Sequence, residues 1–514
     1  TAGSTVLLDR TGPTDPSVGG GSASWQSVSQ ITLAAGGSTD AEVGLAGYEY
    51  HTSTDGGQTW SLPTSGSSVS ITAEGQTLVQ FRAVDALGND SNWAPTGGTA
   101  SATARIDVTG PTVPTVTGGS LAWQSVDSVA VSGGGSTDAL SGIAGYQWRT
   151  STDGGTTWSS ATGGSTAPVT AEGETLVQFR AIDGAGNFSA WAPSSALAGS
   201  TVRIDRGAPT APTVSGGSLA WQNVSSVTVS ASGGTDGGAG LAGYQYRLSI
   251  DGGASWGAAV SGSAATISGQ GETLVQFRSV DLAGNVSAWA PGTPDSTDTV
   301  RIDRTAPVLP TISGGSLAWQ SVNSVTISAT GSTDTWAGFD HYEMRTSTDG
   351  GATWTSPTTA AAITISTPGE TLAQFRSVDA VGNASAWAPA SPGPTNTVRL
   401  DRTAPSDPTV SGGSLTWQQV PAVTISAGGA TDGLSGVSFY QCRTSTDGGF
   451  TWSPTAAGAS VTVTTEGETI VQFQTVDAAG NTSNWAPASA GQANTVRIDR
   501  TAPSTPTVSG GSLT

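Results

Sequence analysis

Aspartate is the residue type whose spacing suggests chemistry in this chain. One aspartate ends each segment of the V-R-I-D type, a second follows a threonine about 30 residues later, and a third opens each V/I-D-x-x-G-N-x-S motif. Ca²⁺ takes six to eight oxygen ligands, so three carboxylates brought together would form the start of a calcium site. The candidate sets are Asp107, Asp138 and Asp183, and Asp205, Asp236 and Asp281.

Other reactive side chains are scarce. The only cysteine is Cys442, all 18 basic residues are arginine, and the two histidines are His51 and His341. An intramolecular disulfide, lysine Schiff-base chemistry and a Walker-type phosphate loop are therefore excluded. An enzyme needs one constellation in one pocket, whereas this chain carries near copies of every motif. We therefore expect no catalytic residues and no required cofactor.

Composition excludes further classes of function. The formal charge of −20 disfavours nucleic acid partners. The sequence has no run of 18 apolar residues, so we expect no membrane span. The chain opens at Thr1 without an apolar leader, so we expect any targeting segment to lie outside it.

A repeat of 98 residues dominates the sequence. The strand-ending aspartate recurs at this interval from Asp9 to Asp499, and three sets of tryptophans keep the same interval. This predicts five units without insertion or deletion, and fragments of neighbouring units at either end. The predicted ranges are 1–10 (last strand of a preceding unit), 11–108, 109–206, 207–304, 305–402 and 403–500 (units one to five), and 501–514 (first strand of a following unit).

The elements that must position these residues are predicted to be short strands. In unit two, Val129 and Val131 alternate with small residues, and Tyr146 and Trp148 alternate in Y-Q-W-R. Such period-two patterns, separated by Gly, Pro, Asp and Ser clusters, are typical of strands. A period near 98 suits one seven-stranded sandwich. The predicted fold class is all-β, a tandem array of Ig-like or fibronectin-III-like sandwiches.

The segments S-G-I-A-G-Y-Q-W-R-T-S-T-D-G-G-T-T-W, E-G-E-T-L-V-Q-F-R-A-I-D-G-A-G-N-F-S and V-R-I-D-R followed by A-P resemble those of bacterial Ig-like modules. The resemblance covers essentially the whole chain. It implies tandem repeats of a large secreted or surface-anchored protein, and hence an extracellular location. It is weak for any one activity, because sandwiches host many functions.

Seven-strand topology places the loops between the second and third strands and between the last two strands at one pole of a module. The last strand of the preceding module arrives at that pole, so each Asp set would meet at a joint between units. Cadherins hold Ca²⁺ at such joints, although their dense acidic strings are absent here. The alternative is that these aspartates only accept local backbone donors in turns.

Every unit also carries S-x-D-G-G-x-T/S-W, which is similar to the Asp-box of sialidases. Asp-Gly-Gly favours a tight turn whose carboxylate accepts backbone donors, so we expect a structural hairpin covered by the tryptophan. The residues are Asp55, Trp60, Asp153, Trp158, Asp251, Trp256, Asp349, Trp354, Asp447 and Trp452.

Four further expectations concern side chains that recur. The position of Tyr50, Trp148, Tyr246, Met344 and Cys442 is predicted to be interior. The neighbouring Arg149, Arg247, Arg345 and Arg443 are predicted to face outward and pair with carboxylates. The tryptophans either pack internally or stack on sugar rings. The N-x-S sequons at Asn89, Asn187, Asn223, Asn285, Asn383 and Asn481 would accept glycans in an N-glycosylating host.

These patterns favour a mechanical role. Equal units joined by proline-rich segments predict a rod of roughly 150–200 Å, which could serve as the stalk, adhesin or fibre of a large surface protein. Its partners would be neighbouring repeats of the same chain, and lateral or head-to-tail association could yield a filament. The alternatives are carbohydrate- or host-surface-binding modules with glycan partners, or accessory repeats of a secreted hydrolase whose catalytic domain lies elsewhere.

Overall fold

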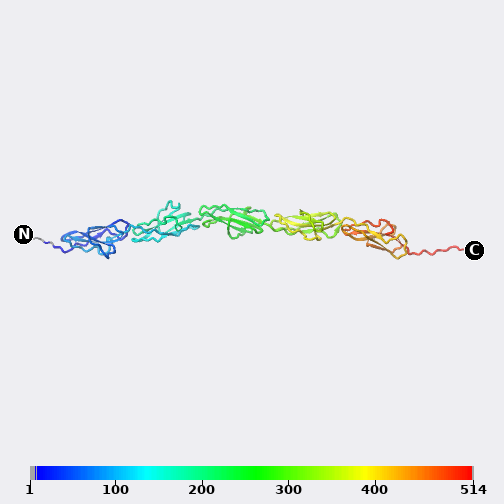
Figure 1. The fold of residues 1–514 in the computed structure, drawn as a ribbon, viewed down its shortest axis with the longest axis horizontal. Helices are drawn as coiled ribbons and strands as arrows, with labels where there is room; N and C mark the ends of the chain where they lie inside the picture. The colour runs from blue at the N-terminus through cyan, green and yellow to red at the C-terminus, as the bar shows by residue number, and fades with distance from the viewer. Residues whose placement is uncertain (1–5, 7, 512–514) are drawn as a thin grey trace, which may run out of the picture.

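The computed structural model describes residue 6 and residues 8–511. Five β-sandwich units lie end to end in an elongated, gently curved row, with the two ends of the chain at opposite ends of the row (Figure 1). The predicted all-β fold of repeated sandwiches is confirmed. Among the described residues, no helix has the length and apolar character that a membrane crossing requires.

Unit two shows the architecture. One sheet has three antiparallel strands in the order β13-β10-β8, and the other has five strands in the order β12-β11-β14-β15-β9. The edge strand β9 pairs with β15 in parallel, with Trp123 opposite Arg203. The elements are β8 (Thr115–Thr117), β9 (Trp123–Gln124), β10 (Val129–Gly134), β11 (Ile143–Ser151), β12 (Thr162–Gly163), β13 (Thr166–Val169), β14 (Gly173–Asp183), the 3₁₀ turn η2 (Ala198–Ser200) and β15 (Thr201–Ile204).

The other units repeat this plan. Unit one has β1 (Ser17–Gly19), β2 (Ile31–Gly36), β3 (Leu45–Ser53), β4 (Thr64–Ser65), β5 (Ser68–Ile71), β6 (Gly75–Asp85), η1 (Ala100–Ala102) and β7 (Thr103–Ile106). Unit three has β16 (Thr213–Ser215), β17 (Val227–Ser232), β18 (Leu241–Ser249), β19 (Val260–Ser261), β20 (Ala264–Ile267), β21 (Gly271–Asp281) and β22 (Thr299–Ile302). Unit four has β23 (Thr311–Ser313), β24 (Trp319–Gln320), β25 (Val325–Thr330), β26 (Phe339–Ser347), β27 (Thr358–Thr359), β28 (Ala362–Ile365), β29 (Gly369–Asp379) and β30 (Thr397–Leu400). Unit five has β31 (Thr409–Ser411), β32 (Val423–Gly428), β33 (Val437–Ser445), β34 (Ala456–Ala457), β35 (Ser460–Val463), β36 (Gly467–Asp477) and β37 (Thr495–Ile498).

The strand number varies slightly between units. Units one, three and five have the predicted seven strands, whereas units two and four have an eighth, because the residues beside the last strand pair there over two positions. In the other three units the same contact is a single parallel bridge, such as Gln222 with Ile302. The exact unit boundaries stay a prediction.

The predicted end fragments fall partly outside the described residues, at 1–5, 7 and 512–514. The described residues 8–10 and 501–511 form no strand. A first strand such as β8 is held by a later strand of its own unit, here β10, which explains why residues 501–511 are extended without pairing.

Each core is small and built around one phenylalanine. Phe179 of β14 is fully buried and packs with Val131, Val202 and Ile204 between the sheets. Gly133 of β10 passes so close that an added Cβ would lie 2.4 Å from the Phe179 ring, so a side chain here would require the ring to shift. The other four units have alanine at this position. The equivalents of Phe179 are Phe81, Phe277, Phe375 and Phe473.

The segment 184–200 leaves β14 and returns along the same sheet. It is held by a pair of hydrogen bonds between Phe179 and Ala192, both 2.8 Å, and by the Gln178 side chain, which donates to the Pro193 carbonyl at 2.7 Å. This segment places the Trp191 indole over the outer face of the sheet, beside Arg149.

Candidate functional site

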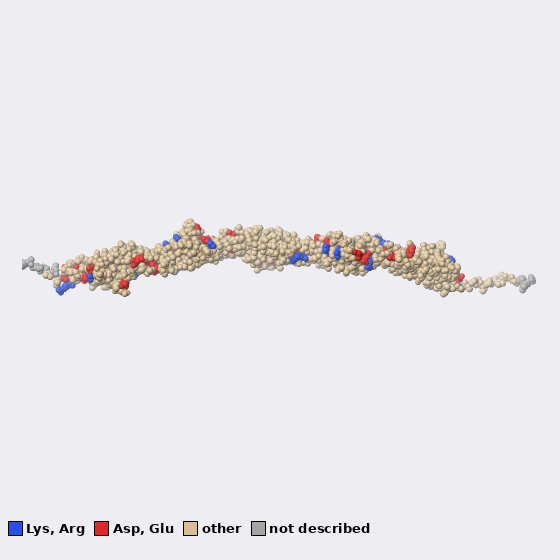
Figure 2. Space-filling model, viewed as in Figure 1, with Lys and Arg blue, Asp and Glu red and all other residues tan. Residues whose placement is uncertain are grey.

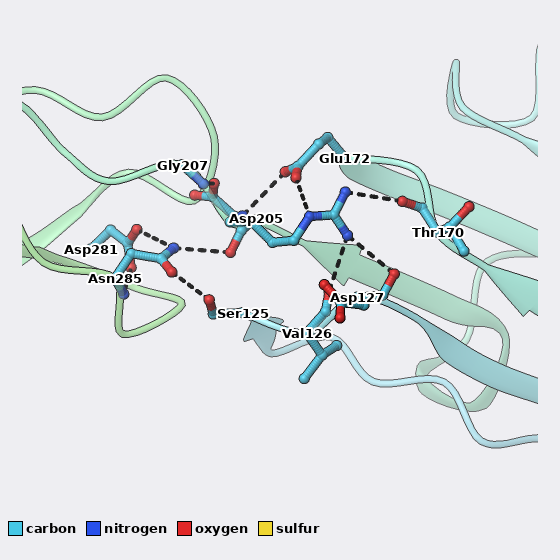
Figure 3. A network of polar contacts seen from close by, with 10 residues as sticks. Ser125, Val126, Asp127, Thr170, Glu172, Asp205, Gly207, Asp281 and Asn285 are labelled. Carbon is cyan, nitrogen blue, oxygen red and sulfur yellow. Dashed lines mark hydrogen bonds and ion pairs between the residues drawn. The ribbon is translucent and has the colours of Figure 1, made fainter.

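Charged residues are sparse on the face of the molecule that Figure 2 shows. Figure 3 shows the charged and polar groups at the joint between units two and three. Asp205 follows β15, and its backbone carbonyl accepts a hydrogen bond from the Asn285 side chain of unit three at 2.9 Å. Its carboxylate accepts from the amides of Gly207 at 2.9 Å and Ala239 at 2.6 Å. Asp205 is therefore bound by unit three.

The next residue is bound in the opposite direction. The Arg206 guanidinium forms an ion pair with Glu172 at 2.8 Å. It also donates to the carbonyls of Val126 and Asp127, both at 3.1 Å, and of Thr170 at 3.2 Å. All these acceptors belong to unit two (Figure 3). We call the pair Asp205–Arg206 and its equivalents the joint clamp, because consecutive residues are bound by different units.

The clamp recurs along the chain with small variations. Arg304 and Arg402 donate to the same three carbonyl positions of their own units. At the first joint Val108 replaces the arginine, and the Glu74 carboxylate instead accepts from the Val108 amide at 2.7 Å. The asparagine bond to the aspartate carbonyl is kept throughout, from Asn187, Asn285, Asn383 and Asn481 to Asp107, Asp205, Asp303 and Asp401, at 2.8, 2.9, 3.1 and 2.9 Å respectively.

The same asparagines lie in the sequons. The Asn285 amide nitrogen donates to the Asp205 carbonyl and, at 2.7 Å, to the Asp281 carboxylate. Both protons of the amide are engaged, and a glycan would replace one of them. The joint geometry therefore disfavours the glycan interpretation at the five repeated sequons.

The aspartates predicted to meet at the joints do so. Asp107, Asp138 and Asp183 each offer a carboxylate oxygen, and these oxygens lie within 4.8 Å of one another. The same holds for the second predicted set. Three more sets, which the sequence analysis did not name, follow from the 98-residue period: Asp9, Asp40, Asp85; Asp303, Asp334, Asp379; and Asp401, Asp432, Asp477.

Local donors satisfy much of this charge. Asp281 accepts from the amides of Ala283 and Asn285 at 2.9 and 2.8 Å, and Asp236 accepts from those of Gly238 and Gly240. These are the turn bonds of the alternative interpretation. The atoms that the Asp sets offer to a metal are all carboxylate oxygens, which are hard ligands and fit a hard divalent cation.

The first set leaves one oxygen unused. Asp9 is 6 % exposed, and its Oδ2 atom is buried without a hydrogen-bond partner among the residues that the structure describes. In unit two the matching oxygen of Asp107 accepts from the Ser141 amide at 3.1 Å. In unit one the equivalent amide, of Val43, donates to Asp40 instead, at 2.8 Å. A buried carboxylate oxygen without a donor is costly, and a bound cation would relieve this cost.

In the repeated hairpins the aspartate carboxylate accepts hydrogen bonds from residues of its own turn. Asp153 accepts from the Ser151 hydroxyl at 2.7 Å, from the Thr157 amide at 2.9 Å and from the Thr157 hydroxyl at 2.6 Å. The hydrogen bond from the Thr157 side chain is the main cause that lowers the pKa of Asp153 to about 2. Gly154 and Gly155 take φ values of 72° and 91°, which favour glycine. This carboxylate is occupied by its own hairpin.

The arginines beside the interior position do not pair with carboxylates, so that prediction was wrong. The Arg149 guanidinium lies 4.7 Å from the Trp158 ring centroid and 4.4 Å from that of Trp191. Its Nε and Nη2 donate to the Gln178 side chain at 3.0 and 2.7 Å. Cation–π stacking between two indoles holds a guanidinium where no acid is within reach. Arg247, Arg345 and Arg443 are held in the same way.

Arg180 extends this stack, which we call the Trp–Arg ladder. Its guanidinium lies 4.7 Å from Trp191 and 3.8 Å from Phe188. In unit one His51 takes the place of Arg149, and its ring stacks on Trp93 at 3.7 Å and 8° and on Trp60 at 4.2 Å and 17°. Sequence reasoning missed the ladder, although arginine and tryptophan recurring at one shared period was an available signal.

The five residues at the predicted interior position differ in how deeply they are buried. Cys442 is 5 % exposed and belongs to the core of unit five, as predicted. Burial raises the pKa of its thiol. Its equivalents Tyr50, Trp148, Tyr246 and Met344 are partly buried and pack against the cores of their units.

A family model described as BNR/Asp-box repeat matches residues 51–62, which contain the first hairpin. The chain is 33 % identical over 298 residues to Exoglucanase B of Cellulomonas fimi, and the match covers 55 % of this chain and 25 % of that protein. The chain thus spans about a quarter of that relative's length. The solved FN1–FN3 domains of chicken CNTN1 are 14 % identical, with a TM-score of 0.21, and the match covers 55 % of this chain and 97 % of that chain.

Proposed function

We propose that this chain is a non-catalytic accessory segment of a secreted polysaccharide-degrading protein, in which it holds other modules apart outside the cell. The observation that carries the proposal is the joint clamp: at the joint between units two and three, Asp205 is bound by the following unit and Arg206 by the preceding one. A joint held from both sides resists bending, so the units keep their distance. The similarity to Exoglucanase B supports the polysaccharide context.

The test uses the complete natural protein. We expect a polysaccharide-hydrolysing module beyond the repeats, and we expect deletion of units two to four to lower activity on an insoluble polysaccharide while leaving activity on a soluble oligosaccharide unchanged. A complete protein without such a module, or a deletion without effect on the insoluble substrate, would contradict this function. A surface-anchored protein forming fibres in electron micrographs would instead support the stalk, adhesin or filament interpretation, which uses the same clamps and stays a prediction.

A second function, calcium binding by the Asp sets, is favoured by the Asp9 oxygen of the first set, which has no partner among the described residues. Asp9, Asp40 and Asp85 would supply carboxylate oxygens, and water would complete the six to eight ligands. Bound Ca²⁺ would stabilise the folded joint by mass action. It would also relieve repulsion among three carboxylates.

This function is tested by thermal unfolding with Ca²⁺ and with chelator. We expect Ca²⁺ to raise the midpoint in the intact chain and to raise it less in the Asp40→Asn variant. The control is Asp127→Asn, since Asp127 is exposed and outside the five sets. An unchanged midpoint in the intact chain, together with no terbium luminescence sensitised by tryptophan, would refute a metal at the joints.

A further inference from the structure

A cavity of about 210 Å³ lies in unit two, and none of its lining residues belongs to the joint clamp. One wall is the hairpin, through Gly154, Gly155 and Trp158, and another is the returning segment at 193–196. Its floor is the strand β14 at 176–178. Two separate loops over a strand therefore enclose it. This cavity has no part in the proposed spacer function, so a chain that binds no ligand in the cavity would still act as a spacer.

The same place is hollow in unit five. A cavity of about 300 Å³ lies between Gly448, Gly449 and Trp452 of the hairpin and residues 488–490 of the returning segment. The two cavities share the Gly-Gly-x-x-Trp wall, a glutamine of the central strand (Gln178 or Gln472), and an alanine at equivalent positions, Ala196 and Ala490. The same space therefore recurs at equivalent residues of two units that are separated by 294 residues.

The tryptophan in each wall is the end of the Trp–Arg ladder. The guanidinium groups of Arg149 and Arg180 both make cation–π contacts with Trp191. Trp158, by contrast, has a cation–π contact with Arg149 alone among the described residues. The ladder fixes the orientation of Trp158, and its indole NH is bound to the Gly155 carbonyl at 3.1 Å. The cavity is thus lined by an aromatic ring that is already held in place.

The remaining lining selects the chemistry of a ligand. The cavity of unit two is lined by uncharged residues throughout. The cavity of unit five also has Arg443 in its lining, and the guanidinium of Arg443 is stacked on Trp452 and Trp485. The exposed hydroxyls of Ser194 and Ser195 hold no hydrogen bond in the part of the chain that the structure describes, so they are free to bind a ligand. Gln178 is already bound to Arg149 and Pro193, and forms a fixed wall. The formal charge of −20 repels anions.

We propose that these cavities each bind one ring of a neutral polysaccharide. A sugar ring has apolar C–H faces that pack on an indole and hydroxyls that bond to serine, and these are the two kinds of group on offer. The volumes, about 210 and 300 Å³, lie at or below the lower end of the range for drug-sized ligands, so the occupant is one small ring rather than a whole oligosaccharide. The sites contribute weak contacts that add along the array.

The experiment is isothermal titration of the full chain with cellohexaose, xylohexaose and mannohexaose, with oligogalacturonate as the anionic comparison. We expect at least one neutral hexasaccharide to bind, with units two and five each providing a site, and the anion not to bind. The combined Ala196→Trp and Ala490→Trp variant fills both cavities, and we expect at least tenfold weaker binding.

The matched control is Ala130→Trp, which adds the same bulk on the exposed face of the other sheet of unit two and should leave binding unchanged. Trp158→Ala combined with Trp452→Ala should also abolish binding. An unaltered circular dichroism spectrum of the filled variant shows that the fold survives. The proposal is overturned if all three hexasaccharides fail to bind at millimolar concentration, or if the filled variant binds as tightly as the parent chain.

Discussion

The joint between units three and four should lose stiffness when Trp336 is replaced by alanine. Trp336 belongs to unit four, and its ring lies 6.0 Å from that of Trp221 in unit three. It also reaches unit three at Gly271, where an added Cβ would lie 3.1 Å from the indole. The equivalent residues are Leu140, Gly238 and Leu434, so the third joint carries the largest apolar contact at this position.

The magnitude follows from burial. Trp336 is 42 % exposed, so on the order of 100–150 Å² of its surface is covered. At about 25 cal/mol per Å² this corresponds to ~2.5–4 kcal/mol as an upper value. Unit four itself supplies part of that cover, so we assign about 1–2 kcal/mol to the joint. Losing this contribution should raise the population of bent conformations about 5–30-fold.

The assay is a distance distribution between two spin labels, measured by pulsed electron resonance. Cysteines at Ser263 and Ala361, which are equivalent exposed positions in units three and four, would carry the labels in a chain whose Cys442 is replaced by alanine. We expect Trp336→Ala to broaden the distribution and Leu434→Ala, at the next joint, to leave it unchanged. An equally narrow distribution for Trp336→Ala would refute the assignment of joint stiffness to this contact.

Four further predictions concern single residues. Gly238→Ala should lower the stability of the second joint by about 1–3 kcal/mol, measured by denaturant unfolding, because the new Cβ would lie 2.6 Å from the Asp205 carboxylate. Burial lowers the pKa of His51 below 6.5, so the unfolded chain binds the proton more readily than the folded chain does. Unit one should therefore lose stability as pH falls below about 6.5, and His51→Arg should remove this pH dependence in thermal unfolding. The pKa of Asp153, about 2 against an ordinary 3.8, implies that its hairpin is stabilised above pH 3.8 and loses that stabilisation as pH falls through about 2, which a carboxyl NMR titration would show. Arg149→Lys should destabilise unit two by about 1–2 kcal/mol in chemical unfolding, because lysine keeps the charge but loses the planar stacking and the paired bonds to glutamine.

The repeat and the sheets could be predicted from the sequence because they rest on local periodicity. Alternation at Val129 and Val131 predicted a strand that the structure confirms as β10. The Asp sets were also within reach, since a 98-residue period and the topology of a sandwich bring the same three loops to every joint. Their convergence within 4.8 Å is a consequence of topology rather than of local propensity.

The side-chain partners of the arginines could not be predicted in the same way. The Trp–Arg ladder of unit two joins four segments: β11 supplies Arg149, the hairpin Trp158, the returning segment Trp191 and β14 Arg180. Arginine near carboxylates and arginine between indoles have the same one-dimensional pattern, and only the path of the returning segment decides between them. Similarly, the residue pair at the unit boundary predicted a joint, but not that Asp205 and Arg206 are bound by different units.

The joint clamp also gives a physical reason for the equal length of the units. Asn285 must reach a carbonyl 80 residues earlier in the chain, while the Ala239 amide must reach the same aspartate from 34 residues away. An insertion in the loop of Asn285 would leave the Asp205 carbonyl without this donor. An insertion in the loop of Ala239 would leave one oxygen of the buried Asp205 carboxylate without its donor, and each loss is destabilising. Loops on the sides of the sandwich face no such constraint, yet they too keep their length here. Side loops that vary would still permit a stiff row, so their uniformity calls for a second cause. The ligand site proposed between two side loops of units two and five supplies one.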